Sequence, residues 1–158
     1  MAVSEQQLQT GLLFSGVIRA VALLCLITLV AICHIYGDTI QLGIAEQQRV
    51  FIRTVLYVVA ITTFPLMKFI RHVLLRLNQT AKGKSTAKSR YMMTIIVSMA
   101  VAESIGIYGF VMYVLGDSYN TLYIFTGLSA LAMFLYKPKL EEYQAIIEAI
   151  AAQQKVRD

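Results

Sequence analysis

Charged residues are scarce in this chain of 158 residues. Only 15% of the residues are charged and 58% are hydrophobic, whereas roughly 45 to 50% of a soluble globular domain is apolar. This composition excludes an ordinary soluble domain and leaves few side chains from which an active site could be built. It indicates a membrane protein, and the chain length indicates a single membrane domain over residues 1–158.

Cysteine and histidine each occur only twice. Cys25 and Cys33 are eight residues apart on one predicted helix, too far for a disulfide, so we interpret them as small packing residues. His34 and His72 fall near opposite membrane faces and cannot share a metal ion. No nucleophile with a base, no pair of acids and no glycine-rich cofactor loop can be assembled. We therefore expect no enzyme activity, no metal and no cofactor.

Basic residues are absent from the first ten residues, MAVSEQQLQT. A signal peptide has a positively charged start and a shorter apolar core than the run that follows here. We therefore expect the first apolar segment to remain as a membrane span.

Four apolar segments have lengths near the roughly 20 residues that cross a hydrocarbon core of about 30 Å. The second is the least apolar, and it crosses only if Arg53 and Lys68 extend to the two interfaces. Pro65, near one end of that segment, is tolerated in a membrane helix. The predicted fold is all-α, an integral membrane protein of two hairpins and a C-terminal amphipathic helix. Its predicted spans are residues 12–36, 50–74, 91–116 and 118–136.

Positive charge gathers on one side of these spans. Residues 68–90 include seven basic residues and no acid, whereas the two connections on the other side carry three acids and one arginine. By the positive-inside rule, the basic loop at 75–90 and both termini are cytoplasmic. This asymmetry accounts for the net charge of +5 without a nucleic-acid partner. We expect a multi-pass protein of a bacterial-type inner membrane, surrounded by the lipid bilayer.

One carboxylate interrupts the third span. In RYMMTIIVSMAVAESIGIYGFVMYVLGD, Glu103 is the only charge among the 26 residues between Arg90 and Asp117. A charged residue at the centre of a membrane helix costs about 2.5 to 3.5 kcal/mol or more, so such residues normally face protein or water. We expect Glu103 to be buried at a helix interface.

Small residues recur beside Glu103 at spacings of three and four, a pattern that lets helix backbones approach closely. They are Ser98, Ala102, Gly106 and Gly109. The side chains that could hydrogen-bond to Glu103, among which the sequence does not choose, are Arg19, Thr62, Thr63 and Ser129.

The stretch AESIGIYGFVMYVL, residues 102–115, resembles the ion-carrying helix of the proteolipid (c or K) subunits of rotary ATPases. It also resembles a helix of small bacterial four-span membrane proteins. In the proteolipids the carboxylate binds and releases the translocated proton or sodium ion. The resemblance therefore implies this role for Glu103, with Tyr108 as a hydrogen-bonding neighbour. It covers 14 residues, and the first two spans lack the regularly spaced glycines of a proteolipid hairpin.

The tail predicts a cytoplasmic helix at residues 138–155, opened by Pro138 and with Glu141 and Glu142 in its first turns. Its apolar residues form one stripe that we expect to dock on a partner helix or on the protein's own loop, or to rest at the membrane surface. The stripe consists of Leu140, Tyr143, Ile147 and Ile150.

Two functions compete on this evidence. The first is a non-catalytic packing or accessory subunit of a larger inner-membrane assembly or of a homo-oligomer, with Glu103 as an interhelical hydrogen-bonding group. The second is proton or cation translocation with Glu103 as the titrating group. Regulators, sensors and transport accessories form a broader third class. The small size of the chain favours the first function.

Overall fold

Long helices account for almost all of the described chain. The computed structural model describes residues 5–80 and 87–155, and all regular structure within these ranges is helical. The all-α prediction is therefore confirmed. The elements are α1 (Glu5–Ile40), α2 (Glu46–Thr80), α3 (Ala87–Val114), α4 (Tyr119–Leu135) and α5 (Leu140–Lys155).

Three of these helices are long and apolar enough to cross a membrane, at Leu13–Gly37, Glu46–Asn78 and Ser89–Val114. The fourth predicted span corresponds to α4, which is apolar but has only 17 residues. At 1.5 Å per residue its length is about 26 Å, slightly less than a hydrocarbon core. Helices α2 and α3 also extend into both ends of the predicted loop at 75–90, and residues 81–86 lie outside the described ranges.

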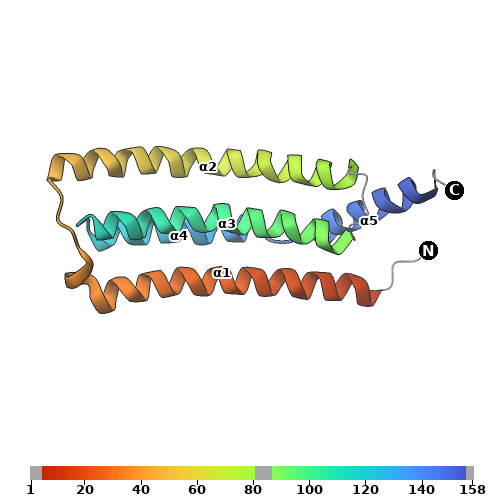
Figure 1. The fold of residues 1–158 in the computed structure, drawn as a ribbon, viewed down its shortest axis with the longest axis horizontal. Coiled ribbons are helices and arrows are strands. Elements are labelled where there is room, and N and C mark those ends of the chain that lie inside the picture. The colour runs from red at the N-terminus through yellow and green to blue at the C-terminus, as the bar shows by residue number, and fades with distance from the viewer. Residues whose placement is uncertain (1–4, 81–86, 156–158) are drawn as a thin grey trace.

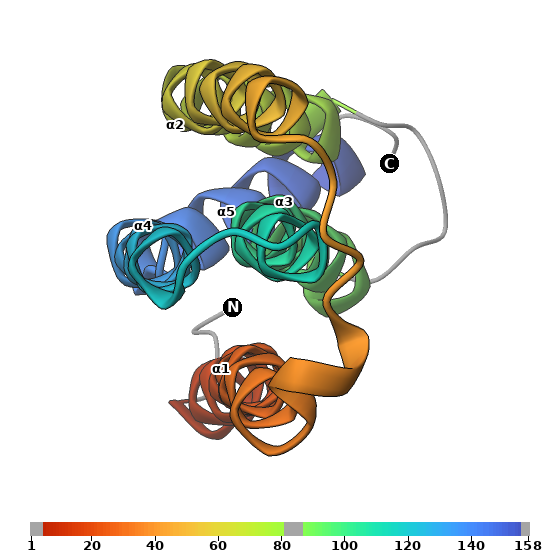
Figure 2. The same ribbon diagram turned by 90° about the vertical axis from the view of Figure 1, so that its left-hand side faces the viewer.

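Helix α3 occupies the middle of the bundle. Figure 2 shows α4 beside α3, with α1 and α2 on opposite sides of this pair, and Figure 1 shows α1 and α2 running along its length. Fully buried side chains of α3 include Ile95, Ile105 and Met112. Because α1 and α2 each contact the bundle along one side only, most of their large apolar side chains remain exposed on the other side.

The tail helix packs on its own bundle. Tyr143 stacks on Tyr91 of α3, with ring centroids 5.1 Å apart, and Ile146 is fully buried. Burial raises the pKa of the Tyr143 hydroxyl above its usual value, so this group stays protonated at neutral pH. The predicted apolar stripe thus packs against the protein's own helices through Tyr143. Two details differ from the prediction: Leu140 is 40% exposed, and the buried Ile146 was not part of the predicted stripe.

Helix α5 begins at Leu140, two residues later than predicted, so Pro138 precedes the helix instead of opening it. The cause lies in the linker between α4 and α5. The Tyr91 hydroxyl accepts a hydrogen bond from the Lys139 N–H and donates one to the Lys139 carbonyl, both at 2.8 Å. These two bonds hold the linker against α3 just before the helix starts.

Candidate functional site

Glu103 lies on α3 at the edge of the packed core. Its side chain is half-buried, whereas the sequence led us to expect a buried one. Within the described residues, no hydrogen bond or ion pair reaches its carboxylate. Ile96, Ile107 and Val111 are 41 to 45% exposed, and at about 100° per helical residue they lie on the same side of α3 as Glu103. The carboxylate therefore borders an exposed apolar face of α3.

The small residues of α3 lie on another side of the helix, where it meets α4. Ser129 of α4 donates a hydrogen bond of 2.8 Å to the Ala102 carbonyl. A methyl group at Gly109 would lie 3.1 Å from a backbone carbonyl of α4, and one at Gly106 would meet Leu26 of α1. Ser98 is 2% exposed and bonds within α3. These residues allow close contact between the backbones of α3 and α4.

The four suggested partners of Glu103 make other interactions. Thr62 and Thr63 donate hydrogen bonds to carbonyls of their own helix, the shortest at 2.9 and 2.7 Å respectively. The guanidinium of Arg19 lies over a phenylalanine ring of α4, and Ser129 bonds to the α3 backbone. None of the four is hydrogen-bonded to Glu103 in the part of the chain that the structure describes.

Tyr108 belongs to a different surface of α3. Its ring meets the edge of Phe125 at a centroid distance of 6.4 Å, and Phe125 in turn stacks on Tyr57 of α2 at 4.7 Å. Five residues of an α-helix turn through about 140° beyond one full revolution. Glu103 and Tyr108 therefore point to different sides, and the structure does not bring them together.

An ion pair connects α2 to the turn between α3 and α4 at one end of the bundle. Arg53 of α2 lies 3.1 Å from Asp117, in the turn between α3 and α4, and Arg49 donates a 2.9 Å hydrogen bond to the Gly116 carbonyl. Gly116 has a φ of +91°, a conformation that favours glycine. The sequence placed Arg53 at an interface but did not identify its acidic partner, which is 64 residues away.

A second ion pair connects α2 to α5 at the opposite end of the bundle. Arg71 of α2 is 6% exposed and pairs with Glu142 of α5. It also donates hydrogen bonds to the carbonyls of Tyr136, at 2.6 Å, and Lys137, at 3.2 Å. One side chain thus binds two carbonyls of the linker that follows α4 and a carboxylate in the first turn of α5. Nothing in the sequence pattern indicates this contact, because Arg71 is one of several basic residues in the same segment.

Asn78 and Arg90 join α2 to α3 beside the basic loop. The Asn78 amide donates to the Arg90 carbonyl at 2.9 Å and to the Thr94 hydroxyl at 2.7 Å, and Arg90 donates to the Asn78 carbonyl at 2.9 Å. These bonds hold α2 and α3 together at the end of the bundle beside the predicted basic loop, which connects the two predicted hairpins.

A group of tyrosines surrounds His34 where α1 meets the start of α4. The Tyr123 hydroxyl lies 2.8 Å from His34 Nε2, and His34 Nδ1 lies 2.9 Å from the Val30 carbonyl. Because a carbonyl only accepts, the neutral ring carries its proton on Nδ1. Tyr119 packs against the same ring, with centroids 4.9 Å apart, and its hydroxyl donates to the carbonyl of buried Cys33.

The other cysteine and histidine are separate from this group. Cys25 is exposed on α1, and His72 is exposed on α2. Across residues 5–80 and 87–155, no group of three or more His, Cys, Asp or Glu side chains comes close enough to hold a metal ion.

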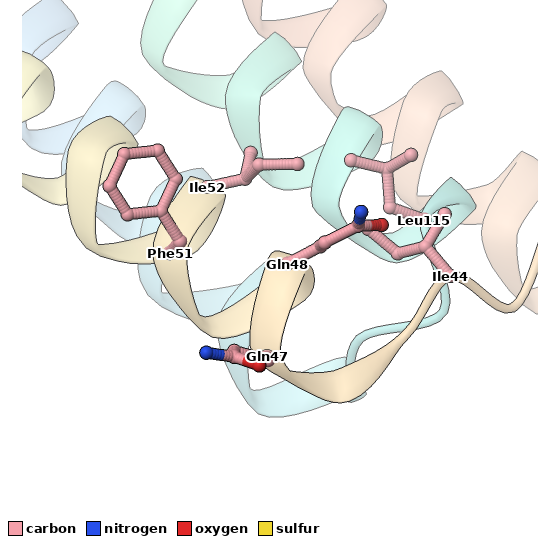
Figure 3. A pocket seen from close by; sticks show the side chains of 6 residues that line it. All are labelled: Ile44, Gln47, Gln48, Phe51, Ile52 and Leu115. Atoms are coloured by element: carbon pink, nitrogen blue, oxygen red, sulfur yellow. The ribbon is translucent and has the colours of Figure 1, made fainter.

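A shallow apolar hollow of about 560 Å³ lies where the α1–α2 connection meets the end of α3. In Figure 3, Gln48 extends toward Leu115 and Ile44, whereas Phe51 points away from them. No charged side chain lines the hollow, and it is separate from Glu103. The lining residues are Ile44, Gln47, Gln48, Phe51, Ile52 and Leu115.

Comparison with protein-family models, curated proteins and solved structures gives no match to this chain. The proteolipid resemblance of residues 102–115 therefore depends on the local sequence pattern alone.

Proposed function

We propose that this chain is a non-catalytic, four-span subunit of an inner-membrane assembly or homo-oligomer, with both termini cytoplasmic. The observation that carries the proposal is the half-buried Glu103, which has no partner within the described residues and borders an exposed apolar face of α3. A helix from a neighbouring subunit on this face would cover the apolar side chains and hydrogen-bond to the carboxyl group.

The positions of the two ion pairs support four spans. Arg53 and Arg71 are eighteen residues apart on α2, which corresponds to about 27 Å along the helix axis. This is close to the hydrocarbon thickness of about 30 Å. Helix α4 runs between the two levels, because Asp117 shortly precedes it and Tyr136 directly follows it. Charged groups at the interfaces would therefore hold both ends of this short helix.

Glu103 then lies near the middle of the bilayer. It is thirteen residues from both Arg90 and Gly116. A charged side chain exposed to lipid at this depth costs about 2.5 to 3.5 kcal/mol or more, whereas hydrogen bonds between membrane helices contribute roughly 0.6 to 2 kcal/mol. Both terms favour an arrangement in which another helix shelters the carboxyl group.

Native mass measurement after gentle detergent extraction tests this proposal. The wild-type chain should appear in a species heavier than its own 17.7 kDa. Glu103→Gln keeps a hydrogen-bonding group and should preserve this species, whereas Glu103→Leu removes that group and should release monomer. A wild-type monomer, or equal assembly of the two variants, would contradict the proposal.

The same variants separate assembly from ion translocation. If Glu103 carries a proton or cation, Glu103→Gln should abolish flux in proteoliposomes, and a hydrophobic carbodiimide should modify Glu103 in a pH-dependent manner. The separation of Tyr108 from Glu103 gives this second function less geometric support.

A further inference from the structure

Two cations lie close to one exposed aromatic ring between α1 and the end of α4. The Arg19 Cζ atom is 5.8 Å from the centroid of the Phe134 ring, and the Lys137 Nζ atom is 5.6 Å from the same centroid. The ring is 59% exposed. A cation near an exposed ring gains only about 0.5 to 1 kcal/mol, so the ring alone does not satisfy these two charges.

No acid neutralises either cation within the described residues. The two ion pairs of that part of the chain use Arg53 and Arg71. In addition, the Nε atom of Arg19 is buried and has no hydrogen-bond acceptor. A buried donor without an acceptor costs about 1 to 3 kcal/mol. The site therefore has two positive charges without an acidic partner within the described residues, and an anion would stabilise both charges.

The depth of the site indicates which anion fits. Phe134 lies at the end of α4, next to the carbonyl of Tyr136 that Arg71 binds. This is the level at which the proposed function places the cytoplasmic membrane interface, so the inference depends on the membrane placement made there. Phospholipid phosphates lie at this level, and basic pockets between membrane helices on the cytoplasmic side bind anionic headgroups. Leu131, one turn earlier on α4, is 48% exposed and offers an apolar surface to an acyl chain.

We propose that Arg19 and Lys137, which both lie within 6 Å of the centroid of the Phe134 ring, bind the headgroup phosphate of an anionic phospholipid. The guanidinium and the ammonium group donate hydrogen bonds to the phosphate oxygens, and the acyl chains lie along the exposed apolar residues of α4.

Native mass spectrometry of the full chain tests the site with two lipids that share acyl chains, phosphatidylglycerol and phosphatidylcholine. The wild-type chain should retain phosphatidylglycerol preferentially. Arg19→Gln and Lys137→Gln should each reduce that preference about fivefold, the effect expected for one basic residue at a membrane surface. Lys68→Gln is the matched control, because it removes the same charge from an exposed position on α2.

Three results would overturn the proposal. These are equal retention of the two lipids, an equal effect of Lys68→Gln, and displacement of phosphatidylglycerol by inorganic phosphate, which would indicate a general phosphate site. If Arg19→Gln does not fold, Lys137→Gln decides the question, because its side chain is exposed. Assembly mass is a separate readout. Lipid loss with an unchanged assembly would leave the proposed function intact, and a monomer that still selects phosphatidylglycerol would leave the lipid site intact.

Discussion

At the scale of single residues, two glycines differ in the space around them: Gly109 is tightly packed and Gly127 is not. A Cβ atom at Gly109 of α3 would lie 2.7 Å from the Phe125 Cβ and 3.1 Å from the Leu122 carbonyl oxygen. A Cβ atom at Gly127 of α4 would have no neighbour within 4 Å. The backbone of α4 cannot move without disturbing the helix, so Gly109 has no room for even a methyl group.

We therefore expect Gly109→Ala to destabilise the fold by about 1 to 3 kcal/mol, the usual cost of overpacking. Gly127→Ala should be neutral or stabilising by up to about 1 kcal/mol, because alanine favours the helical backbone. Thermal unfolding of both variants in one detergent gives the comparison. Similar midpoints would show that α3 and α4 are not in close contact.

The two arginine ion pairs also differ at this scale. The side chains of Arg71 and its partner Glu142 are 7% and 18% exposed, and those of Arg53 and its partner Asp117 are 34% and 5% exposed. Removing one member of a buried pair leaves an uncompensated charge and costs about 3 to 5 kcal/mol. The cost is smaller for Arg53, because Arg53 lies partly in solvent and Asp117 keeps a hydrogen bond from the Ser118 N–H.

Arg71→Met should accordingly lower the free energy of unfolding by about 3 kcal/mol or more. Arg53→Met should lower it by about 1 to 3 kcal/mol, the cost of leaving the buried Asp117 carboxylate without one of its partners. Denaturant titration of both proteins in the same micelles measures the difference. If Arg53→Met lowers the free energy of unfolding more than Arg71→Met does, the contacts of Arg71 with α5 and the α4–α5 linker are not the stronger of the two sets.

At the scale of elements, α5 shows how an amphipathic helix finds its partner. The sequence predicted its apolar stripe but not what would cover it. The covering surface comes from α2 and α3, where Tyr91 and Arg71 meet the start of the helix. Ile146 is fully buried, because the angle at which a helix docks decides which part of its apolar side faces the core.

We expect Ile146→Ala to cost about 2 to 4 kcal/mol, as for other buried aliphatic side chains. Leu140→Ala, at a position 40% exposed, should change stability by about 0.5 kcal/mol or less. Limited proteolysis of the tail and thermal unfolding both report the difference. Equal protease resistance of the two variants would argue against docking of α5 on the bundle.

At the scale of the whole molecule, charge is divided between the two ends of the bundle. One end carries Arg71, Arg90 and the basic residues beside them, and the other carries Asp117 together with Arg49 and Arg53. From this excess of basic residues at the first end, the positive-inside rule predicts that this end and both termini are cytoplasmic.

Thiol labelling tests this orientation with single cysteines in a variant that lacks Cys25 and Cys33. A membrane-impermeant maleimide should label Gln41→Cys in intact spheroplasts. It should label Gln144→Cys only after permeabilisation, because the proposed orientation puts α5 at the cytoplasmic end. Both positions are exposed in the fold, so access to the thiol depends on the membrane alone. The reverse labelling pattern would contradict the proposed topology.

The sequence by itself determined the helical class, the approximate positions of the apolar helices and the central place of Glu103. These properties follow from residue periodicity, segment length and charge, which act locally along the chain. Only the tertiary structure decided which groups meet across the bundle. Asp117 pairs with Arg53 and Glu142 with Arg71 over 64 and 71 residues, and Glu103 faces away from Tyr108 and from the α4 contact. Such pairings depend on the rotation and tilt of each helix against its neighbours, and those angles result from the packing of all the side chains together.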